Sequence, residues 1–462
     1  MARFTGLLGI LVFLLIAWAL SSDRKRISWR IVGWGLALQW IFAVIVLRGE
    51  WIASALSFLP FPKGAGWAVL GLMVLPALLK RFAKLQDRRL NWAVFALVAL
   101  GLLRGNLVGA SFDRMRIVVE HLMAYAKAGA TFVFGGLADP GGSIGLVFAF
   151  VVLPTIILVA SLFAAIYYAG VRQWVVGAAA KAMGRLLKIS GAESVSVAAS
   201  ILMGQTEAPL TIRPFLARMT LSELMVIMTA GMAHVSGSIM VAYVQVAHVD
   251  IVHLLTAVIM TAPGAVMMAK ILVPETEVPE TSGAVTVDIP NHDANLVDAL
   301  SRGALEGGQL AFNVAVMLIA FIALVALANG LLHAVHGTWS LEGGLGAAFK
   351  PLAWLMGVPW ADAGRVGQLL GERMVTNEFV AFIDLGKMGT GAIPALAAAK
   401  SRIIATFALC GFANFSSIAI QIGGIGALAP ERRGDLARLG VKAMIAGTLA
   451  NFLSACIAGV LL

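Results

Sequence analysis

The sequence GQTEAPL, residues 204–210, places an amide, a hydroxyl and a carboxylate side by side in a strongly apolar part of the chain. Pro209 would interrupt any helix that ran through this stretch. A carboxylate at membrane depth costs about 2.5–3.5 kcal/mol on insertion scales. Irregular backbone is tolerated there only where it faces protein or a water-filled cavity. Together these features indicate a substrate or ion site in a transporter, and a short polar loop outside the bilayer is the alternative.

The composition identifies the class of protein that surrounds this stretch. Hydrophobic residues make up 60% of the chain and charged residues 13%, whereas a soluble domain has about 25% charged residues. The apolar runs are continuous and as long as helices, which indicates an all-α integral membrane protein and not a barrel of alternating strands.

Charge and cysteine usage exclude several other classes. The net charge is +10, but the basic residues gather in short loops between apolar runs, so orientation in the membrane explains them better than nucleic-acid binding. Cys410 and Cys456 both lie in apolar runs, and no metal-binding spacing occurs. We therefore predict no metal, no cofactor and no nucleic-acid partner.

Residues 1–171 are predicted to form an N-terminal membrane scaffold. The apolar run at 5–20 resembles a signal peptide, but more basic residues follow it than precede it, which favours an uncleaved first helix with its N-terminus outside. Further elements are expected at 31–47 (a span), 62–110 (a two-span insertion), 112–130 (an amphipathic helix on the membrane surface) and 144–169 (a span).

Residues 172–307 are predicted to contain a re-entrant hairpin at 190–219. A cytoplasmic amphipathic helix precedes it, and spans follow at 224–246 and 251–272. Basic residues flank both ends of the hairpin segment, so both ends are expected on the same side of the membrane. One full span kinked at Pro209 is the alternative.

The remaining chain repeats this plan. Residues 308–362 are expected to form a scaffold span and an interfacial segment. Residues 363–462 are expected to form a second re-entrant hairpin at 364–396, around Thr376-Asn377-Glu378, and two C-terminal spans at 403–422 and 443–460.

The two polar breaks suggest an inverted repeat. Each is followed by a span with polar residues at its centre: His234, Ser236 and Ser238 in one, and Asn414, Ser416 and Ser417 in the other. Inverted repeats with broken helices at the membrane midplane are typical of secondary transporters. No Walker A motif occurs, so an ion gradient is the expected energy source.

The polar residues at the breaks suit a neutral, hydroxyl-rich solute. Carboxylates accept hydrogen bonds from ligand hydroxyls, amides both donate and accept, and an aromatic face stacks on a flat ring. No strong cation clamp accompanies them. The expected ligand groups are Glu207, Glu378, Gln205, Asn377, Asn414 and Phe412.

Three motifs carry a resemblance to a known family. Residues 371–382, GERMVTNEFVAF, resemble the signature G-x-K-x-x-x-N-E-F-V-A-[FYM] of concentrative nucleoside transporters. Residues 204–207, GQTE, and 412–417, FANFSS, resemble two further motifs of that family in the same order. The resemblance covers about residues 1–50 and 115–462. It implies a nucleoside symporter of the bacterial cytoplasmic (inner) membrane, not an enzyme, that forms a homotrimer in which a transport domain moves like an elevator against a scaffold.

The resemblance also implies roles for single residues in binding a uridine-like nucleoside. Residues that match Gln205, Thr206 and Glu207 face the nucleobase, and residues that match Glu378, Asn414 and Ser417 hold the ribose. Residues that match Phe412 and Ile239 pack near the base.

The chain departs from the family where the coupling ion would bind. Sodium-coupled members have an asparagine at the position of Ser200 and a serine or threonine at that of His234. A histidine nitrogen is a poor sodium ligand, whereas histidine titrates near neutral pH. Proton coupling is therefore expected, with Glu207, Glu378 or His234 as the carrier, although a packing role for His234 is equally compatible with the sequence. Met203 and Val235 complete the predicted ion-coupling set.

Two other departures are the basic residue of the signature, Arg373 in place of lysine, and the insertion at 62–110. Arginine keeps the charge but changes the geometry of the donors. The alternatives to proton-coupled import are a sodium-coupled nucleoside symporter and, from a different class, a nucleoside-gated channel or sensor.

Overall fold

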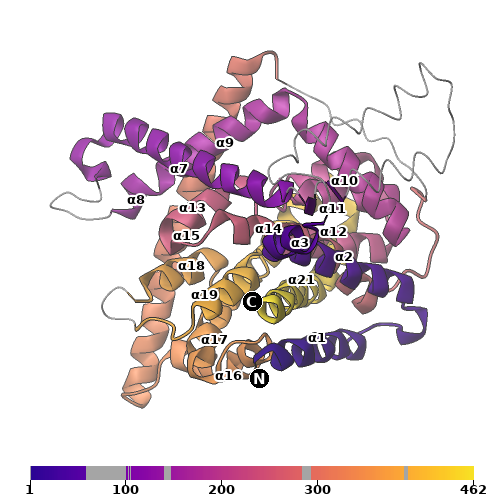
Figure 1. The fold of residues 1–462 in the computed structure, drawn as a ribbon. Helices are drawn as coiled ribbons and strands as arrows, with labels where there is room; N and C mark the ends of the chain where they lie inside the picture. The colour runs from indigo at the N-terminus through magenta and orange to yellow at the C-terminus, as the bar shows by residue number, and fades with distance from the viewer. Residues whose placement is uncertain are drawn as a thin grey trace.

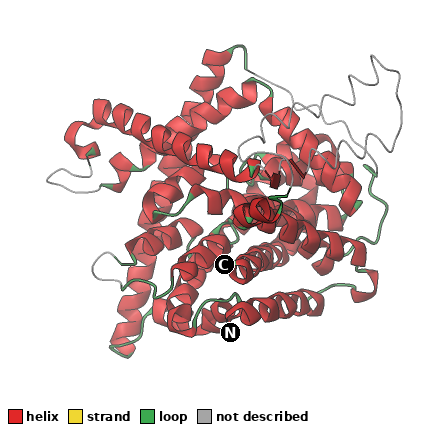
Figure 2. Ribbon diagram, in the orientation of Figure 1, coloured by secondary structure: helices red, strands yellow, loops and turns green. Residues whose placement is uncertain are grey.

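The computed structural model describes residues 2–58, 100–101, 103–104, 106–139, 147–282, 293–389 and 394–462. Every regular element in these ranges is a helix (Figure 2). Most of the expected insertion at 62–110 lies outside the described residues. The chain is thus an all-helical protein, as the composition predicted.

The helices follow one another in the order shown in Figure 1. The first half contains α1 (Ala2–Ala19), α2 (Trp29–Leu47), α3 (Gly49–Ala55), α7 (Leu107–Phe134), α8 (Phe148–Val151), α9 (Leu153–Tyr168), α10 (Val171–Leu187), α11 (Gly191–Ser200), α12 (Leu221–Ala233), α13 (Gly237–Ala247) and α14 (Ile251–Leu272). The second half contains α15 (Leu296–Val335), α16 (Leu341–Leu355), α17 (Trp360–Val375), α18 (Glu378–Lys387), α19 (Ala399–Leu409), α20 (Phe415–Leu428) and α21 (Arg433–Leu461).

Seven helical segments in the described part are long and apolar enough to cross a membrane. The most apolar is α15, whose most apolar stretch has a mean hydropathy of 2.8. Only 11% of the residues in that stretch are buried within the chain. The segment Gly109–Ala138, expected to lie on the membrane surface, also has the length and composition of a span. This distribution is that of a polytopic membrane protein.

The core of the molecule surrounds α21, the C-terminal helix. It packs against α1, α12, α14, α19 and α20, and Figure 1 shows it inside the bundle beside α1. In the segment Leu221–Ala247, 94% of the residues in the most apolar stretch are buried within the chain. The span that follows the first polar break is therefore enclosed by the rest of the chain.

Two spans predicted as continuous helices are broken. The expected span at 224–246 consists of α12 and α13, separated at His234-Val235-Ser236, and the expected span at 403–422 consists of α19 and α20, separated at 410–414. The two breaks lie together, because the backbone N–H of Phe412 donates to the carbonyl of His234 at 3.4 Å. The apolar pattern alone does not reveal such breaks, since apolar residues predominate on both sides of each break.

The first hairpin also differs from the prediction in one limb. It begins with α11, turns at 201–207, and returns as a 3-10 helix, η4 (Ala208–Arg218), where a second α-helical limb was expected. Pro209 and Pro214 lack backbone N–H donors, and Ile212 has non-helical angles (φ −122°, ψ 16°). The prolines thus prevent an α-helix in this limb.

The second hairpin has two α-helices, α17 and α18, around its polar break. Thr376 leaves the helical conformation (φ −97°, ψ −93°). Asn377 is the N-cap of α18, and its Oδ1 accepts a hydrogen bond from Val380 N at 3.0 Å. The break predicted at Thr376-Asn377-Glu378 is thus present.

Arg373 and Asn451 satisfy the carbonyl groups that the broken helices leave without partners. The buried Arg373 guanidinium donates to the carbonyls of Ala408 and Gly411 and to Asn451 Oδ1. The Asn451 amide donates to the carbonyls of Ala233 (2.9 Å) and Cys410 (3.0 Å), one at each break. A Cβ on Gly411 would lie 2.4 Å from Asn451 Oδ1, so only glycine fits there.

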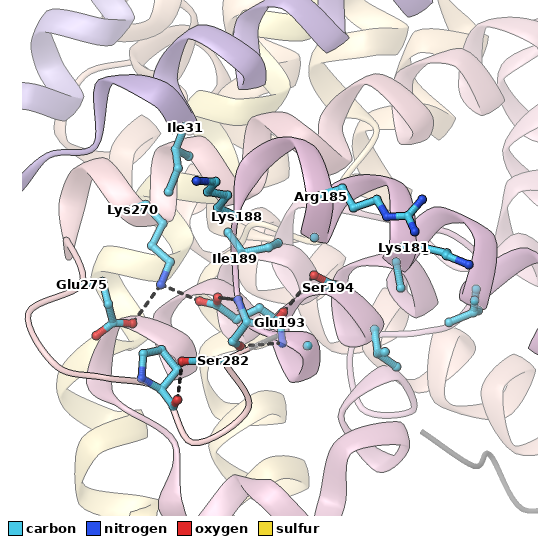
Figure 3. A pocket seen from close by; sticks show the side chains of 18 of the residues that line it. Ile31, Lys181, Arg185, Lys188, Ile189, Glu193, Ser194, Lys270, Glu275 and Ser282 are labelled. Carbon is cyan, nitrogen blue, oxygen red and sulfur yellow. Dashed lines mark hydrogen bonds and ion pairs between the residues drawn. The ribbon is translucent and has the colours of Figure 1, made fainter. Parts of the chain in front are cut away.

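A buried group of charges fixes the base of the first hairpin, beside a cavity of about 780 Å³ (Figure 3). Lys270 Nζ on α14 lies 2.6 Å from Glu193 Oε1 and 3.0 Å from Glu275 Oε2. Glu193 also accepts from Ser190 N at 2.8 Å as part of the N-terminal capping box of α11. Thr220, the N-cap of α12, donates to Glu275 at 3.0 Å. Both ends of the hairpin are thereby tied to α14.

We predict that Lys270→Met destabilises the protein by about 3–5 kcal/mol, because it leaves Glu193 buried without its cation. The measurement is thermal unfolding of the purified protein in detergent. Lys181→Met is the matched control, because Lys181 lines the same cavity but is exposed. Equal unfolding temperatures for the two variants would contradict the proposed role of the charged group formed by Lys270, Glu193 and Glu275.

Candidate substrate and ion site

The carboxylate of Glu378 is the centre of the candidate substrate site. It is 5% exposed and is the first residue of α18, at the positive end of the helix dipole. Tyr243 on α13 donates its hydroxyl to Oε1 at 2.9 Å, and Asn414 donates its amide to Oε2 at 3.1 Å. The Tyr243 ring stacks on Phe382 at a centroid distance of 4.3 Å. Side chains from two other elements, α13 and the start of α20, thus meet at one carboxylate.

A second set of hydrogen bonds joins this carboxylate to the first hairpin. Asn414 Oδ1 accepts from Ser417 N (2.9 Å) and from Ser416 Oγ (2.7 Å), so Asn414 caps α20. Gln205 donates to Ser417 Oγ at 3.2 Å, and Gln421 donates to Gln205 Oε1 at 3.2 Å. The polar network therefore runs continuously from α13 through both hairpins to α20.

The structure brings together four of the nine predicted substrate residues in this network: Gln205, Glu378, Asn414 and Ser417. Of the other five, Asn377 lies beside Glu378 as the cap of α18. Thr206 packs on α20, where a Cβ on Gly424 would meet its Cγ2 at 2.7 Å. The other three differ in burial: Glu207 is exposed, Phe412 is half-buried and Ile239 is buried.

The candidate ion residues Ser200 and His234 are in direct contact. His234 Nδ1 lies 2.7 Å from the carbonyl of Ala230 and 3.1 Å from Ser200 Oγ. A carbonyl accepts only, so Nδ1 carries a proton in this arrangement. Ser200 Oγ in turn donates to the carbonyl of Val197 at 2.8 Å. The hydroxyl oxygen of Ser200 therefore accepts a hydrogen bond from the imidazole N–H.

The other imidazole nitrogen is the basic atom of this pair. Nε2 of His234 is buried and has no hydrogen-bond partner in the described ranges, and its ring lies near the backbone of Val258. Met203 and Val235 are also buried, but their side chains are apolar. The region offers one nitrogen that can gain a proton and few side-chain oxygens.

Sequence reasoning missed two residues of the network, Tyr243 and Gln421, and also Asn451, which satisfies carbonyls at both helix breaks. Each lies in a predominantly apolar run without a recognisable motif around it, so the sequence gives little signal for its role. Gln421 approaches Gln205 where α12 has Gly231, since a Cβ there would lie 2.6 Å from Gln421 Nε2. Such partners are visible only once the helices are placed.

An all-helical chain with broken helices, re-entrant segments and a buried polar network has the architecture of a secondary transporter. Family models match most of the sequence: "Na+ dependent nucleoside transporter N-terminus" at residues 8–61, "Nucleoside recognition" at 149–249, and "Na+ dependent nucleoside transporter C-terminus" at 253–459.

Three related proteins show similarity over nearly the whole chain. An uncharacterized transporter of Haemophilus influenzae is 39% identical, over 99% of this chain and 98% of that protein. The uncharacterized transporter YutK of Bacillus subtilis is 40% identical, over 98% of each chain. The sodium/nucleoside cotransporter 1 of Mus musculus is 34% identical, over 98% of this chain and 63% of the mouse protein.

Solved structures of CNTnw match the fold. The inward-facing, substrate-bound state aligns with a TM-score of 0.82 at 36% identity, over 100% of this chain and 98% of CNTnw. A doubly substituted CNTnw in an outward-facing state aligns with a TM-score of 0.82 at 37% identity. The chain belongs to the concentrative nucleoside transporter family, which confirms the resemblance of its three motifs. It is a transporter and not an enzyme.

We predict that Gln421→Met weakens nucleoside binding roughly five-fold, because Gln205 loses a hydrogen bond worth about 1 kcal/mol and is no longer held in one orientation. The apparent affinity is measured from the competition of unlabelled nucleoside with the uptake of labelled nucleoside. Ile420→Met is the control, on the exposed face of the same helix. An unchanged apparent affinity would show that Gln421 does not orient Gln205.

Proposed function

We propose that this protein imports nucleosides across the bacterial cytoplasmic membrane by symport, with the proton as the coupling ion. The observation that carries the proposal is the buried network around Glu378, which holds a carboxylate, amides and hydroxyls and, among the described residues, no cation hydrogen-bonded to the carboxylate. Those groups match a ribose with its hydroxyls and a base with donors and acceptors. Family membership and the substrate-bound state named for CNTnw support it.

In the proposed complex, Glu378 accepts hydrogen bonds from the ribose hydroxyls, and Asn414 and Ser417 flank it. Carboxylate oxygens have more lone pairs than Tyr243 and Asn414 occupy, so Glu378 can gain ligand donors without losing both protein partners. Gln205, Thr206 and Glu207 face the base, and Phe412 and Ile239 pack beside it. A uridine-like nucleoside fits this set.

The surface of α15 supports the proposed assembly as a homotrimer. Leu305, Phe312 and Ile319 on this helix are 63–77% exposed, which suits contact with a second subunit or with lipid. A scaffold that contains this helix and a transport domain that contains the two hairpins would move against each other. The N-terminus outside and the domain division predicted from the sequence are part of the same proposal.

The contact between His234 and Ser200 favours protons over sodium. Sodium needs several oxygen ligands. The Ser200 hydroxyl already donates a hydrogen bond to the Val197 carbonyl and accepts one from the His234 N–H, so its oxygen is engaged by other partners. Protonation of Nε2 would place a positive charge in the same region and repel a cation. Sodium-coupled symport is the second candidate, since the family description and the mouse relative name sodium.

Glu378→Gln is expected to abolish concentrative nucleoside uptake while the protein still assembles. Hydrogen bonds to a charged acceptor contribute about 1.5–3 kcal/mol, so affinity falls roughly 10- to 100-fold. The assay is labelled uridine uptake into proteoliposomes, with size-exclusion chromatography to confirm assembly. Glu306→Gln, an exposed carboxylate on α15, is the control. Wild-type uptake by Glu378→Gln would exclude the ribose site.

The coupling ion is tested by imposing a proton gradient or a sodium gradient on the same proteoliposomes. We expect accumulation with protons alone, and His234→Ser is expected to weaken the pH dependence of uptake because it removes the imidazole. His253→Ser, a histidine on α14 outside the site, is the control. Accumulation with sodium alone would refute proton coupling, and an unchanged pH profile in His234→Ser would leave that residue a packing role.

A further inference from the structure

A small cavity of about 160 Å³ lies between the second hairpin and the helices α15 and α16. Its walls include Ile322 and Val325 of α15, Glu342 of α16, and Val380 and Ile383 of α18. The hairpin that forms one side of this cavity is the one that carries Glu378. A movement of the hairpin past α15 would therefore change the surroundings of every group in the cavity.

Three carboxylates line the cavity, and two of them are neutralised or fully hydrogen-bonded. Asn329 donates its amide to both oxygens of Glu342, at 3.0 and 2.9 Å. Asp384 pairs with Lys387, whose Nζ lies 2.7 Å from Oδ1. Both acids thus have partners that suit their charged forms.

The third carboxylate, Glu372 on α17, has no such partner. It is 5% exposed, and Gln368 donates to its Oε1 at 2.8 Å. Its Oε2 is buried and has no hydrogen-bond partner in the described part of the chain. The neighbouring Arg373 does not compensate it, because that guanidinium is directed at Gly411, Ala408 and Asn451.

Two acids and one paired lysine are the charged groups around Glu372, so on balance they disfavour its ionised form. Glu342 on α16 and Asp384 on α18 are acidic, Lys387 is already paired with Asp384, and α15 contributes apolar side chains. A buried carboxylate without a cation costs several kcal/mol and is ordinarily relieved by binding a proton. No group of acids, histidines or cysteines that could hold a metal ion occurs in the described ranges.

Glu372 is also connected to the substrate site through its own backbone. Its carbonyl accepts hydrogen bonds from Thr376 N (2.8 Å) and Thr376 Oγ1 (2.6 Å). Thr376 is followed directly by Asn377, the cap of α18, and by Glu378. The carboxyl group at Glu372 and the carboxylate at Glu378 therefore lie on the two sides of one hairpin turn.

We propose that Glu372 is a proton-binding site of the transport cycle, and that the cavity between the second hairpin and α15–α16 controls its protonation. With the cavity closed, Oε2 holds the proton and the side chain is neutral. When hairpin movement admits water, the O–H bond breaks, water takes the proton, and the carboxylate remains until another hydronium ion returns one. The inference rests on the proposed proton-coupled symport and adds a carrier that the sequence analysis did not name.

The test is the ratio of protons to nucleosides transported by the purified protein. Proteoliposomes that contain a trapped pH-sensitive dye report proton entry, and labelled uridine reports nucleoside entry in the same sample. We compare wild type with Glu372→Gln, which keeps the shape and the hydrogen bonding but cannot titrate. Glu342→Gln is the matched control, because it removes a carboxylate from the same cavity that already has partners.

The proposal expects the ratio to fall by one proton per nucleoside in Glu372→Gln and to stay at the wild-type value in Glu342→Gln. Because the ratio is taken per nucleoside transported, a slower variant does not alter it. A wild-type ratio in Glu372→Gln would overturn the proposal.

A second variant covers the case in which Glu372→Gln fails to assemble. Glu372→Asp keeps a titrating carboxyl in a different position, so the pH at half-maximal proton-driven uptake should shift, and an unchanged pH profile would overturn the proposal. Absence of proton entry in the wild type would refute the proposed coupling itself, before any variant is compared.

Discussion

The constraint on which the structure depends is the need to satisfy backbone carbonyls at two helix breaks inside an apolar bundle. A carbonyl without a partner is costly where water is absent, so a break in a membrane-buried helix requires a donor supplied from elsewhere. Arg373 and Asn451 supply it. They join the second hairpin and α21 to both breaks, and Gly411 leaves the space for this contact. The basic residue of the family signature is therefore a structural residue in this chain.

Once the breaks are stable, the substrate site follows from the helix ends that they create. The helices α13, α18 and α20 all begin at interruptions, and each presents unpaired N–H groups and a positive dipole end. Asn377 and Asn414 cap two of them, and Asn414 also binds Glu378. The same side chains thus end the breaks and build the polar network. The broken fold and the proposed ligand site are one arrangement.

The sequence predicted the parts of this arrangement that are local. A polar triplet beside a proline, or an asparagine followed by a glutamate in an apolar run, marks a break by itself, and the helices are interrupted at both places. The breaks at His234 and at 410–414 were missed because their flanks read as uninterrupted apolar spans. The 3-10 conformation of η4 was missed because Pro209 indicates that a helix is interrupted but does not determine the conformation of the residues that follow.

The partners that complete the site depend on packing between distant segments. Gln421 meets Gln205 across 216 residues of sequence, and Tyr243 meets Glu378 across 135. The two buried glutamates of the second hairpin show the same limit. Glu378 and Glu372 are six residues apart, yet one lies among donors and the other has an oxygen without a partner. Only their three-dimensional neighbours separate the proposed ligand acceptor from the proposed proton site.

The most direct test of this account is an experimental structure, by electron cryomicroscopy, of the purified protein with bound uridine. The account predicts density for the ribose within hydrogen-bond distance of Glu378, Asn414 and Ser417, and for the base beside Gln205 and Phe412. Nucleoside density in another cavity, such as the one beside Lys270, would contradict the central claim that the helix breaks form the substrate site.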